Sequence, residues 1–199
     1  MSLTNSILRA TPRDSALVKA ILDRLPEFEG RPIRLGFLPS LRARRGRLHS
    51  GDRQPGTPVH AASFIRARRI VMDRALFDQA SRLGRGEFTR VLLHELFHFV
   101  WVRLGNPARD SFQRLIRHEM LARATGELGW SAESRKRIPL LKPSKSRLWR
   151  EYVCESFCDT GAWLYAGTKC HDEITLARRH RDRRAEWFAL QFSGRPIPL

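Results

Sequence analysis

The sequence has few cysteines, no long apolar run and no sign of an export signal. Three cysteines are too few for a disulfide scaffold and fit a reducing compartment, so we expect a cytoplasmic protein. The most apolar stretch, residues 91–102, is interrupted by His94, Glu95 and His98 and is shorter than the ~18 to 20 residues of a membrane span. The first residues lack a basic patch followed by an apolar core, so we expect no signal peptide and no membrane partner.

Lysine is also scarce, although the chain is strongly basic. There are 37 basic and 20 acidic residues, which gives a net charge of +17, and only five of the basic residues are lysines. The arginines indicate either a polyanionic partner or a solvated surface. No zinc-finger spacing, helix-turn-helix signature or set of stacking aromatics accompanies them. The arginines cluster at residues 42, 44, 45 and 47, at residues 66, 68 and 69, and at residues 178, 179, 181, 183 and 184.

The length and composition predict one folded domain. The 199 residues are 42% hydrophobic and 9% aromatic, which excludes wholesale disorder, and we expect residues 1–199 to form a single domain. Periodicity and breakers predict an α+β fold, mostly helical, with a small β-sheet packed on the helix that carries His94 and His98. We expect helices over about residues 13–25, 74–83, 86–104, 110–128, 144–167 and 172–190, strands over 33–38 and 64–72, and surface loops over 40–58 and 129–143.

The helix expected over residues 86–104 contains the motif H-E-x-x-H. His94 and His98 are four positions apart, so their side chains lie one turn apart on one face and can bind one Zn²⁺ at ~2.0 Å each. Glu95 lies beside the metal, where it can exchange protons with a reacting water. The alternative is a pair of core histidines satisfied by hydrogen bonds. A zinc ion explains better why three ionisable side chains are tolerated in an apolar, buried helix.

A catalytic zinc site needs a third protein ligand, and the helix expected over residues 144–167 offers carboxylates. Glu151, Glu155 and Asp159 are spaced by four and therefore share one face. One of them can bind zinc, and the carboxylate one turn later can orient a ligating histidine through its free ring N–H. The alternative is an exposed acidic stripe that pairs with arginine, and Glu151 lies close to Arg147 and Arg150 in the sequence.

These two helices resemble the gluzincin group of zinc metallopeptidases, which includes the thermolysin and neprilysin families. In that group H-E-x-x-H is followed by a second helix bearing E-x-x-x-D. Residues 155–162, E-S-F-C-D-T-G-A, are similar to the neprilysin-type pattern, and the resemblance extends over about residues 64–166. It implies a zincin-like fold, Glu155 as the third zinc ligand, and Asp159 as the hydrogen-bond partner of a ligating histidine.

A rival alignment uses Glu151. With Glu155 one turn later and Phe157 at the sixth place, it resembles the E-x-x-x-E helix of the lethal-factor-like peptidases. We favour Glu155, because only that alignment places an aspartate one turn later and Gly161 where the two helices must approach closely.

Several other polar residues are weaker candidates for the site. The gluzincin group commonly has a tyrosine or histidine that binds the oxyanion, and the sequence leaves four candidates open. His118 and Glu119 are not followed by a second histidine and indicate a surface helix. Cys154, Cys158 and Cys170 with His171 form only a weak metal pattern, and small apolar packing is the better interpretation. The four oxyanion candidates are Tyr152, Tyr165, His171 and His180.

The sequence therefore predicts a zinc-dependent metallopeptidase with a peptide or protein substrate. Zinc would activate the water that attacks the peptide bond, and Glu95 would act as general base and then as general acid. The strand over residues 64–72 would offer its edge to an extended peptide. The alternative is a zinc-binding regulatory or nucleic-acid-associated protein that keeps the zincin fold and binds DNA or RNA through its arginine clusters.

Overall fold

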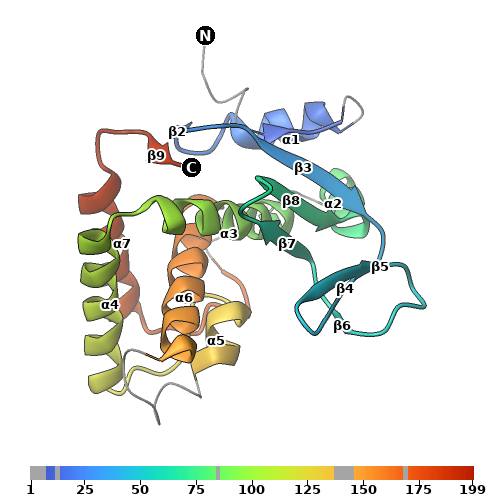
Figure 1. Ribbon diagram of the computed structural model, residues 1–199. Helices are drawn as coiled ribbons and strands as arrows, with labels where there is room; N and C mark the ends of the chain where they lie inside the picture. The colour runs from blue at the N-terminus through green and yellow to red at the C-terminus, as the bar shows by residue number, and fades with distance from the viewer. Residues whose placement is uncertain (1–7, 12–13, 84–85, 137–145, 168–169) are drawn as a thin grey trace.

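The computed structural model describes residues 8–11, 14–83, 86–136, 146–167 and 170–199. These residues form a mixture of helices and small sheets, in agreement with the α+β expectation (Figure 1). The helices are α1 (Ser15–Leu22), α2 (Arg74–Leu83), α3 (Gly86–Arg103), α4 (Asn106–Leu121), α5 (Trp130–Lys136), α6 (Arg147–Tyr165) and α7 (Arg178–Phe192). The strands are β1 (Leu8–Arg9), β2 (Phe28–Glu29), β3 (Ile33–Leu38), β4 (Leu41–Arg44), β5 (Arg47–Ser50), β6 (Thr57–Pro58), β7 (Ala61–Phe64), β8 (Arg69–Asp73) and β9 (Ile197–Pro198).

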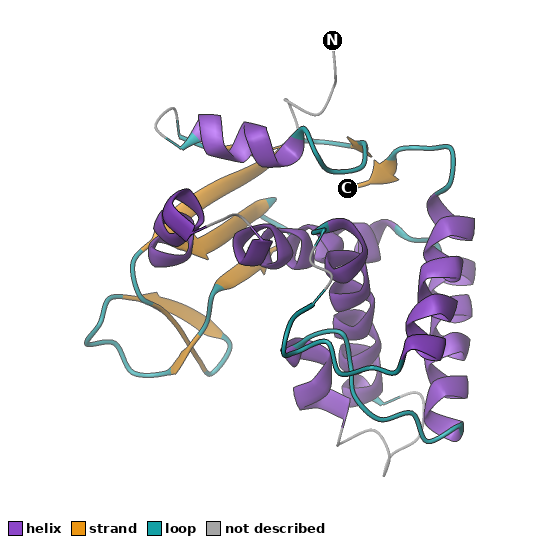
Figure 2. Cartoon of the chain, turned by 180° about the vertical axis from the view of Figure 1, so that it is seen from behind, coloured by secondary structure: helices purple, strands orange, loops and turns teal. Residues whose placement is uncertain are grey.

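The main sheet has the strand order β1-β3-β8-β7. β3 is parallel to both of its neighbours, whereas β7 is antiparallel to β8 and forms an edge. The inward residues of β3 and β8 are almost completely buried, as Ile33, Ile70 and Met72 illustrate. In both views, α1 covers one face of this sheet. Helices α4, α6 and α7 lie beyond α3, away from α1 (Figure 1, Figure 2).

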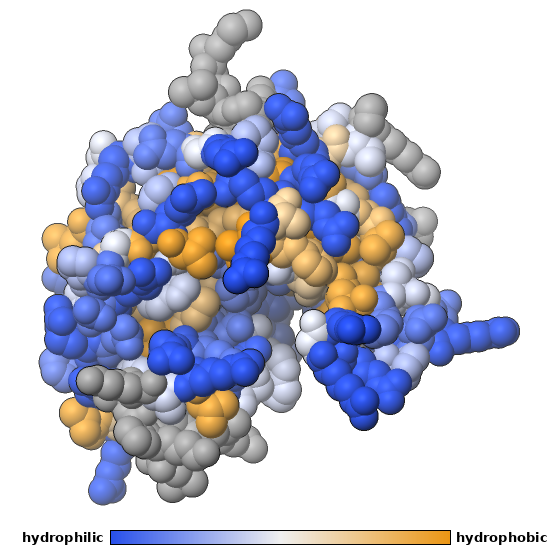
Figure 3. All heavy atoms as spheres, viewed as in Figure 1, coloured by the Kyte–Doolittle hydropathy of each residue, from blue (hydrophilic) through white to orange (hydrophobic). Residues whose placement is uncertain are grey.

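A second small sheet projects from the body of the protein as an arm, formed by β4, β5 and β6 (Figure 1). Its hairpin closes through Arg45 and Gly46, which both have positive φ. Two such residues match the right-handed twist of the flanking strands. The space-filling view shows the arm as a hydrophilic projection (Figure 3).

Helix α3 crosses the centre of the molecule. It begins at Gly86 and is buried on nearly all sides, because its apolar residues pack against the sheet on one side and against α6 on the other. Phe97 is fully buried and faces Gly161 of α6, where a Cβ atom would lie only 2.6 Å from the Phe97 ring. The expectation that Gly161 marks a close approach of the two helices is therefore confirmed.

Several expected elements agree with the structure. The strand over 33–38 is β3, the helix over 74–83 is α2, and the long apolar helix is α3. Ser146 begins α6 and accepts a hydrogen bond from the Trp149 backbone N–H at 3.1 Å, as an N-cap should. The helix expected over residues 13–25 is the shorter α1, and the one over 172–190 begins later, at Arg178 of α7.

Other expectations were wrong. Residues 40–58 are not simply a surface loop, because β4, β5 and β6 lie within them. The single strand over 64–72 is instead the hairpin of β7 and β8, with a turn at residues 65–68. The helix over 110–128 is shifted to α4, and α5 occupies the first part of the loop expected over 129–143, of which residues 137–143 lie outside the described residues. Within the described part of the chain, every helix is too short or too polar to cross a membrane.

Candidate metal centre

Helix α3 places the two motif histidines side by side. The rings of His94 and His98 lie 4.9 Å apart, centroid to centroid, and are nearly perpendicular, at 82°. Both side chains are mostly buried, with 12% and 21% exposed. Their spacing of four follows from the helix, so both rings point toward α6.

Helix α6 brings Glu155 to the same point. Its Oε2 atom lies 3.2 Å from His94 Nε2 and 3.8 Å from His98 Nε2. Donors about 2 Å from one tetrahedral ion are roughly 3.3 Å apart, so these separations fit a shared Zn²⁺. His94, His98 and Glu155 together offer three donor atoms that all lie within 4.8 Å of one another.

Asp159 fixes the orientation of His94. Its Oδ1 atom lies 2.7 Å from His94 Nδ1, which leaves Nε2 facing Glu155. The other oxygen, Oδ2, accepts a hydrogen bond from the Ala132 backbone N–H at 2.9 Å. Both carboxylate oxygens of this buried side chain are thus used. A metal-binding histidine typically has such a carboxylate partner on its other nitrogen.

The start of α5 approaches Asp159 closely because residue 129 is glycine. A Cβ atom at Gly129 would lie 2.5 Å from the carboxylate carbon of Asp159. A side chain there would push α5 away and break the hydrogen bond from Ala132. The sequence analysis missed this role, because it placed residues 129–143 in a loop.

Histidine and arginine side chains surround the carboxylate of Glu155 and favour its charged form. Burial raises the pKa of Glu155, but the hydrogen bond with His94 and the nearby charges of His98 and Arg135 lower it more, to about 2. Arg135 contacts the second carboxylate oxygen, Oε1, at 3.3 Å. Glu155 is therefore an anion at neutral pH, as a metal ligand must be.

Glu95 lies beside this cluster and is held by β7. The Ser63 hydroxyl donates a hydrogen bond to Glu95 Oε2 at 2.5 Å. Only 8% of Glu95 is exposed, yet it lines the same cavity as His94, His98 and Glu155. Ser63 is a further site residue that the sequence analysis did not identify, because no local motif connects residues 63 and 95.

The cluster forms one wall of a cavity of about 610 Å³. β7, the segment before it and α5 also line this cavity. The hollow is visible between the arm and the helical part of the molecule (Figure 3). The polar residues that line it beside the cluster include His60, Ser63, Arg90, Ser131, Ser134 and Arg135.

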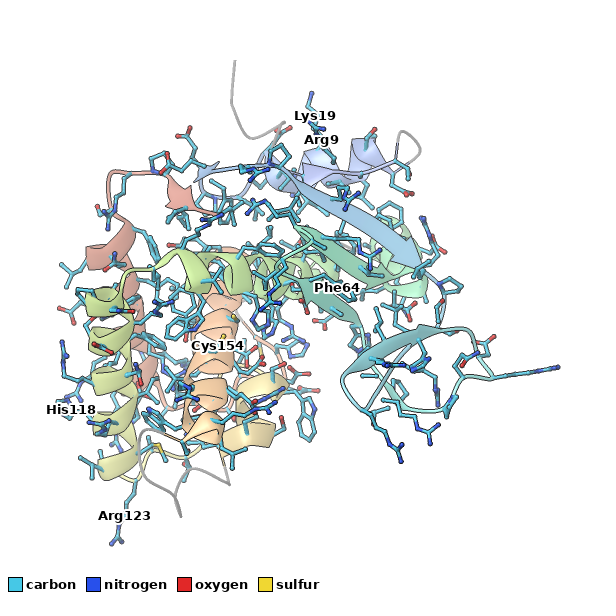
Figure 4. The ribbon with its side chains drawn as sticks, in the orientation of Figure 1. Arg9, Lys19, Phe64, His118, Arg123 and Cys154 are labelled. Atoms are coloured by element: carbon cyan, nitrogen blue, oxygen red, sulfur yellow. The ribbon has the colours of Figure 1, made fainter. Side chains whose placement is uncertain are left out.

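The second histidine is oriented by sulfur atoms. His98 Nδ1 lies 3.6 Å from Cys154 Sγ and 3.4 Å from Cys158 Sγ, and Cys154 lies on α6 where this helix meets α3 (Figure 4). The hydrogen bond from Cys158 lowers the pKa of Cys154 to about 6, an effect that burial opposes and His98 reinforces. Cys158 is buried in the core, as expected, but both thiols also contact a site histidine, which apolar packing alone does not describe. Cys170 is exposed.

Glu151 does not join the cluster. It lies at the half-exposed start of α6 and forms an ion pair with Arg147 at 2.6 Å. This is the surface pairing that the sequence analysis gave as the alternative. Among the three carboxylates of the stripe, the structure brings Glu155 and Asp159 to the histidines and leaves Glu151 outside.

The four oxyanion candidates each contact other residues. Tyr152 is buried and donates to Glu127 at 2.5 Å, and Tyr165 stacks on Phe97. His171 pairs with Glu87, and His180 is buried beside Arg179. None of the four is among the residues that line the described cavity, whereas His60 and Arg135 are.

The surface assignment of His118 and Glu119 was half right. His118 is exposed on α4 and points outward (Figure 4). Glu119 is only 2% exposed and binds the guanidinium of Arg184, which is fully buried and also binds Glu127. Spacing within α4 could not reveal this ion pair, because its partner comes from α7, 65 positions later.

Comparison of the chain with protein-family models, with curated proteins and with solved structures found no match. Two imidazole nitrogens and one carboxylate converge at a cavity wall, and a second carboxylate is held next to them. This donor set, with nitrogen and oxygen ligands on three sides, suits Zn²⁺ with an open fourth position.

Proposed function

We propose that the protein is a zinc-dependent metallopeptidase of gluzincin type, with a zincin-like domain. The observation that carries the proposal is the convergence of the donor atoms of His94, His98 and Glu155 beside Glu95, in the wall of one cavity. Each histidine has its Nδ1 atom occupied by another side chain, which leaves the Nε2 atoms free to bind a metal.

His94 and His98 would bind the ion through Nε2, and Glu155 through Oε2. Zinc, when bound, polarises the carbonyl group of the scissile bond and lowers the pKa of a water molecule. Asp159 holds the His94 ring in place and supports its basicity. The thiols of Cys154 and Cys158 contact the Nδ1 atom of His98, as Asp159 contacts the Nδ1 atom of His94.

Glu95 would act as general base and then as general acid. It is next to the metal ligands in the sequence and lines the same cavity. Ser63 donates to Oε2, which leaves Oε1 to accept a proton from water and pass it to the leaving amine. The side chains of His60 and Arg135 line the cavity, and we propose them as the hydrogen-bond donors to the carbonyl oxygen as it gains charge.

An extended peptide fits the cavity as an added strand. β7 is an edge strand whose residues line the cavity, and its other side pairs with β8. Backbone hydrogen bonds along β7 would hold a peptide across the site with little dependence on its side chains. The peptide-binding edge was expected on a strand over residues 64–72, and we now assign it to β7, Ala61–Phe64.

Metal analysis tests the ligand set. Purified protein should contain zinc near one ion per chain by mass spectrometry. Glu155→Ala should lose most of it, because one of three protein ligands is removed. The matched control is Glu151→Ala, which removes a carboxylate from the same helix at its ion pair with Arg147 and should keep its zinc. Equal zinc in both variants would contradict the site.

Peptide hydrolysis tests the role of Glu95. Glu95→Gln keeps the size of the side chain but cannot accept a proton, so it should retain zinc and lose about 10²- to 10⁴-fold in kcat. Turnover would be followed with a mixture of unstructured peptides by mass spectrometry. Undiminished turnover in this variant would rule out the mechanism.

A further inference from the structure

A second concave site lies apart from the metal centre and is lined almost entirely by arginine. It has a volume of about 370 Å³, and none of its lining residues lines the first cavity. The residues come from β1, from β3 and the segment before it, and from the turn between β7 and β8. We call it the arginine groove; its lining residues are Arg9, Arg31, Pro32, Arg34, Arg66, Ala67 and Arg68.

In the part of the chain that the structure describes, the five positive charges of this groove are not paired with an acidic side chain. No carboxylate lines it, and within the described residues none of the five arginines forms an ion pair. By contrast, Arg74, Arg90 and Arg184 are each paired with acidic side chains. Burial lowers the pKa of Arg68, and the charges of Arg103 and Arg31 lower it further. The groove thus concentrates mutual repulsion that a bound anion would relieve.

Backbone carbonyl groups hold two of these side chains in place. Arg68 donates through Nε to the Pro32 carbonyl oxygen at 3.3 Å and through Nη2 to the Arg31 carbonyl oxygen. Arg34 reaches the Ala67 carbonyl oxygen at 3.5 Å. Arg68 also lies over the Phe99 ring, at 5.6 Å. The remaining arginines, Arg9, Arg31 and Arg66, are exposed and free to bind a ligand.

We propose that the arginine groove binds the phosphate backbone of a nucleic acid duplex, without regard to base sequence. Guanidinium groups match phosphate oxygens in a bidentate manner. Five positive charges exceed what a single phosphate can neutralise, so the ligand carries several phosphates. Among the described residues, no aromatic side chain lines the groove to stack on bases, which favours a duplex over a single strand. The uncharged residues among those that line it are Pro32 and Ala67, too small an apolar surface to insert among lipid tails.

This proposal does not depend on peptidase activity. The groove and the metal cavity share no lining residue, although the β7–β8 hairpin contributes to both. Figure 4 shows Arg9 at the upper edge of the molecule, well away from the arm that borders the metal cavity.

The test measures binding of a fluorescent duplex of about 20 base pairs by anisotropy, over ~50 to ~200 mM salt. The variant Arg9→Gln, Arg31→Gln, Arg66→Gln removes three exposed charges and leaves the side chains of Arg34 and Arg68 with their carbonyl partners. Affinity should fall about tenfold or more, and the slope of log K against log salt should become shallower by about 1 for each phosphate that the variant no longer neutralises.

The matched control removes three exposed arginines from the arm, as Arg44→Gln, Arg47→Gln, Arg53→Gln. It has the same net charge as the groove variant and should keep most of the affinity. Equal weakening in both variants would mean that binding follows overall charge and would overturn the proposal. Unchanged binding in the groove variant would also overturn the proposal. Tight binding of the protein to vesicles containing phosphatidylserine, without binding to the duplex, would overturn it as well. Circular dichroism of all variants establishes that they are folded.

Discussion

At the scale of single residues, the site depends on a few side chains that position others. Asp159 uses both oxygens, one on His94 and one on the start of α5. Ser63 performs a similar task for Glu95. In the proposed mechanism neither residue needs to contact a substrate to affect the chemistry, because each fixes the direction in which a reacting or ligating atom would point.

Asp159→Asn should weaken zinc binding about 10- to 100-fold. The amide keeps the shape of the side chain but loses the charge that supports His94, and it cannot satisfy both partners as an acceptor. Affinity would be measured by competition with a chelator of known strength. Asp182→Asn, at an exposed ion pair with Arg178, is the matched control and should have wild-type affinity. The same affinity in both variants would remove Asp159 from the site.

Ser63→Ala should lower kcat roughly tenfold and leave the zinc content unchanged. The hydroxyl that holds Glu95 is lost, so the carboxylate spends less time in its productive position. Ser134→Ala is the control, because Ser134 lines the same cavity but donates to the Ser131 carbonyl oxygen. A loss of zinc in Ser63→Ala would show that the serine supports the fold of the site instead.

The residues of the site differ in how well the sequence predicted them. His94, Glu95 and His98 were predicted to lie together because a helix alone fixes their relative positions. Glu155 and Asp159 were predicted from their spacing and a family resemblance, and the structure places both beside the histidines. Ser63 and Gly129 were missed, because each meets the site only through tertiary packing.

At the scale of elements, the crossing of α3 and α6 determines the geometry of the site. The donor atoms come from both helices, so the distance between the helices sets the distance between the donors. Gly161 allows that distance, because only a residue without a side chain fits against the Phe97 ring.

Gly161→Ala should lower the free energy of unfolding by about 1 to 2 kcal/mol and weaken zinc binding. Overpacking costs about 1 to 3 kcal/mol, which the higher helix propensity of alanine partly offsets. Urea unfolding measures the stability. Gly36→Ala is the control, since a Cβ atom at Gly36 would meet nothing within 4 Å. Equal stability of the two variants would mean that α3 and α6 can separate without cost.

Elements with a strong apolar pattern were predicted, and those with a weak pattern were not. β3 was placed closely because Pro32 and Pro39 bound a short apolar stretch, and α2 and α3 because glycines follow α2 and lie at both ends of the long apolar run of α3. The strands of the arm were missed because arginine, glycine and proline dominate residues 40–58, where the sheet has little core to reveal an alternation. The short helix α5 was missed for a similar reason, because few of its residues are buried.

At the scale of the whole molecule, the buried ion pairs join distant parts of the chain. Arg184 of α7 binds Glu119 of α4 and Glu127, and Lys136 of α5 also reaches Glu127 at 3.1 Å. Breaking such a network leaves an uncompensated buried charge, which typically costs about 3 to 5 kcal/mol.

Acid should destabilise the protein through Glu127. Burial raises the pKa of Glu127, but Arg184, Lys136 and Tyr152 lower it more, so the net pKa lies below its ordinary value of 4.5. A carboxylate with a lowered pKa in the folded state stabilises the fold above the pKa of the unfolded state. This contribution is lost as pH falls through the pKa of the folded state. The free energy of unfolding should therefore decrease progressively as the pH is lowered below about 4.5.

Urea unfolding at a series of pH values checks this. Glu127→Gln should be less stable at pH 7 and should lose less further stability in acid. The control is Glu29→Gln, at an exposed position, whose free energy of unfolding should depend on pH as that of the wild type does. Parallel curves for the wild type and Glu127→Gln would assign the acid sensitivity to other groups.

The separation of the site residues along the chain has a thermodynamic consequence. His94 and Asp159 are 65 positions apart, and the helices that carry them meet only in the folded state. An ion bound between α3 and α6, as we propose, would cross-link a large loop of the chain, and the unfolded chain offers no preformed site for it. By mass action, the melting temperature would then rise with the concentration of free metal, and the lifetime of the protein would depend on the metal supply around it.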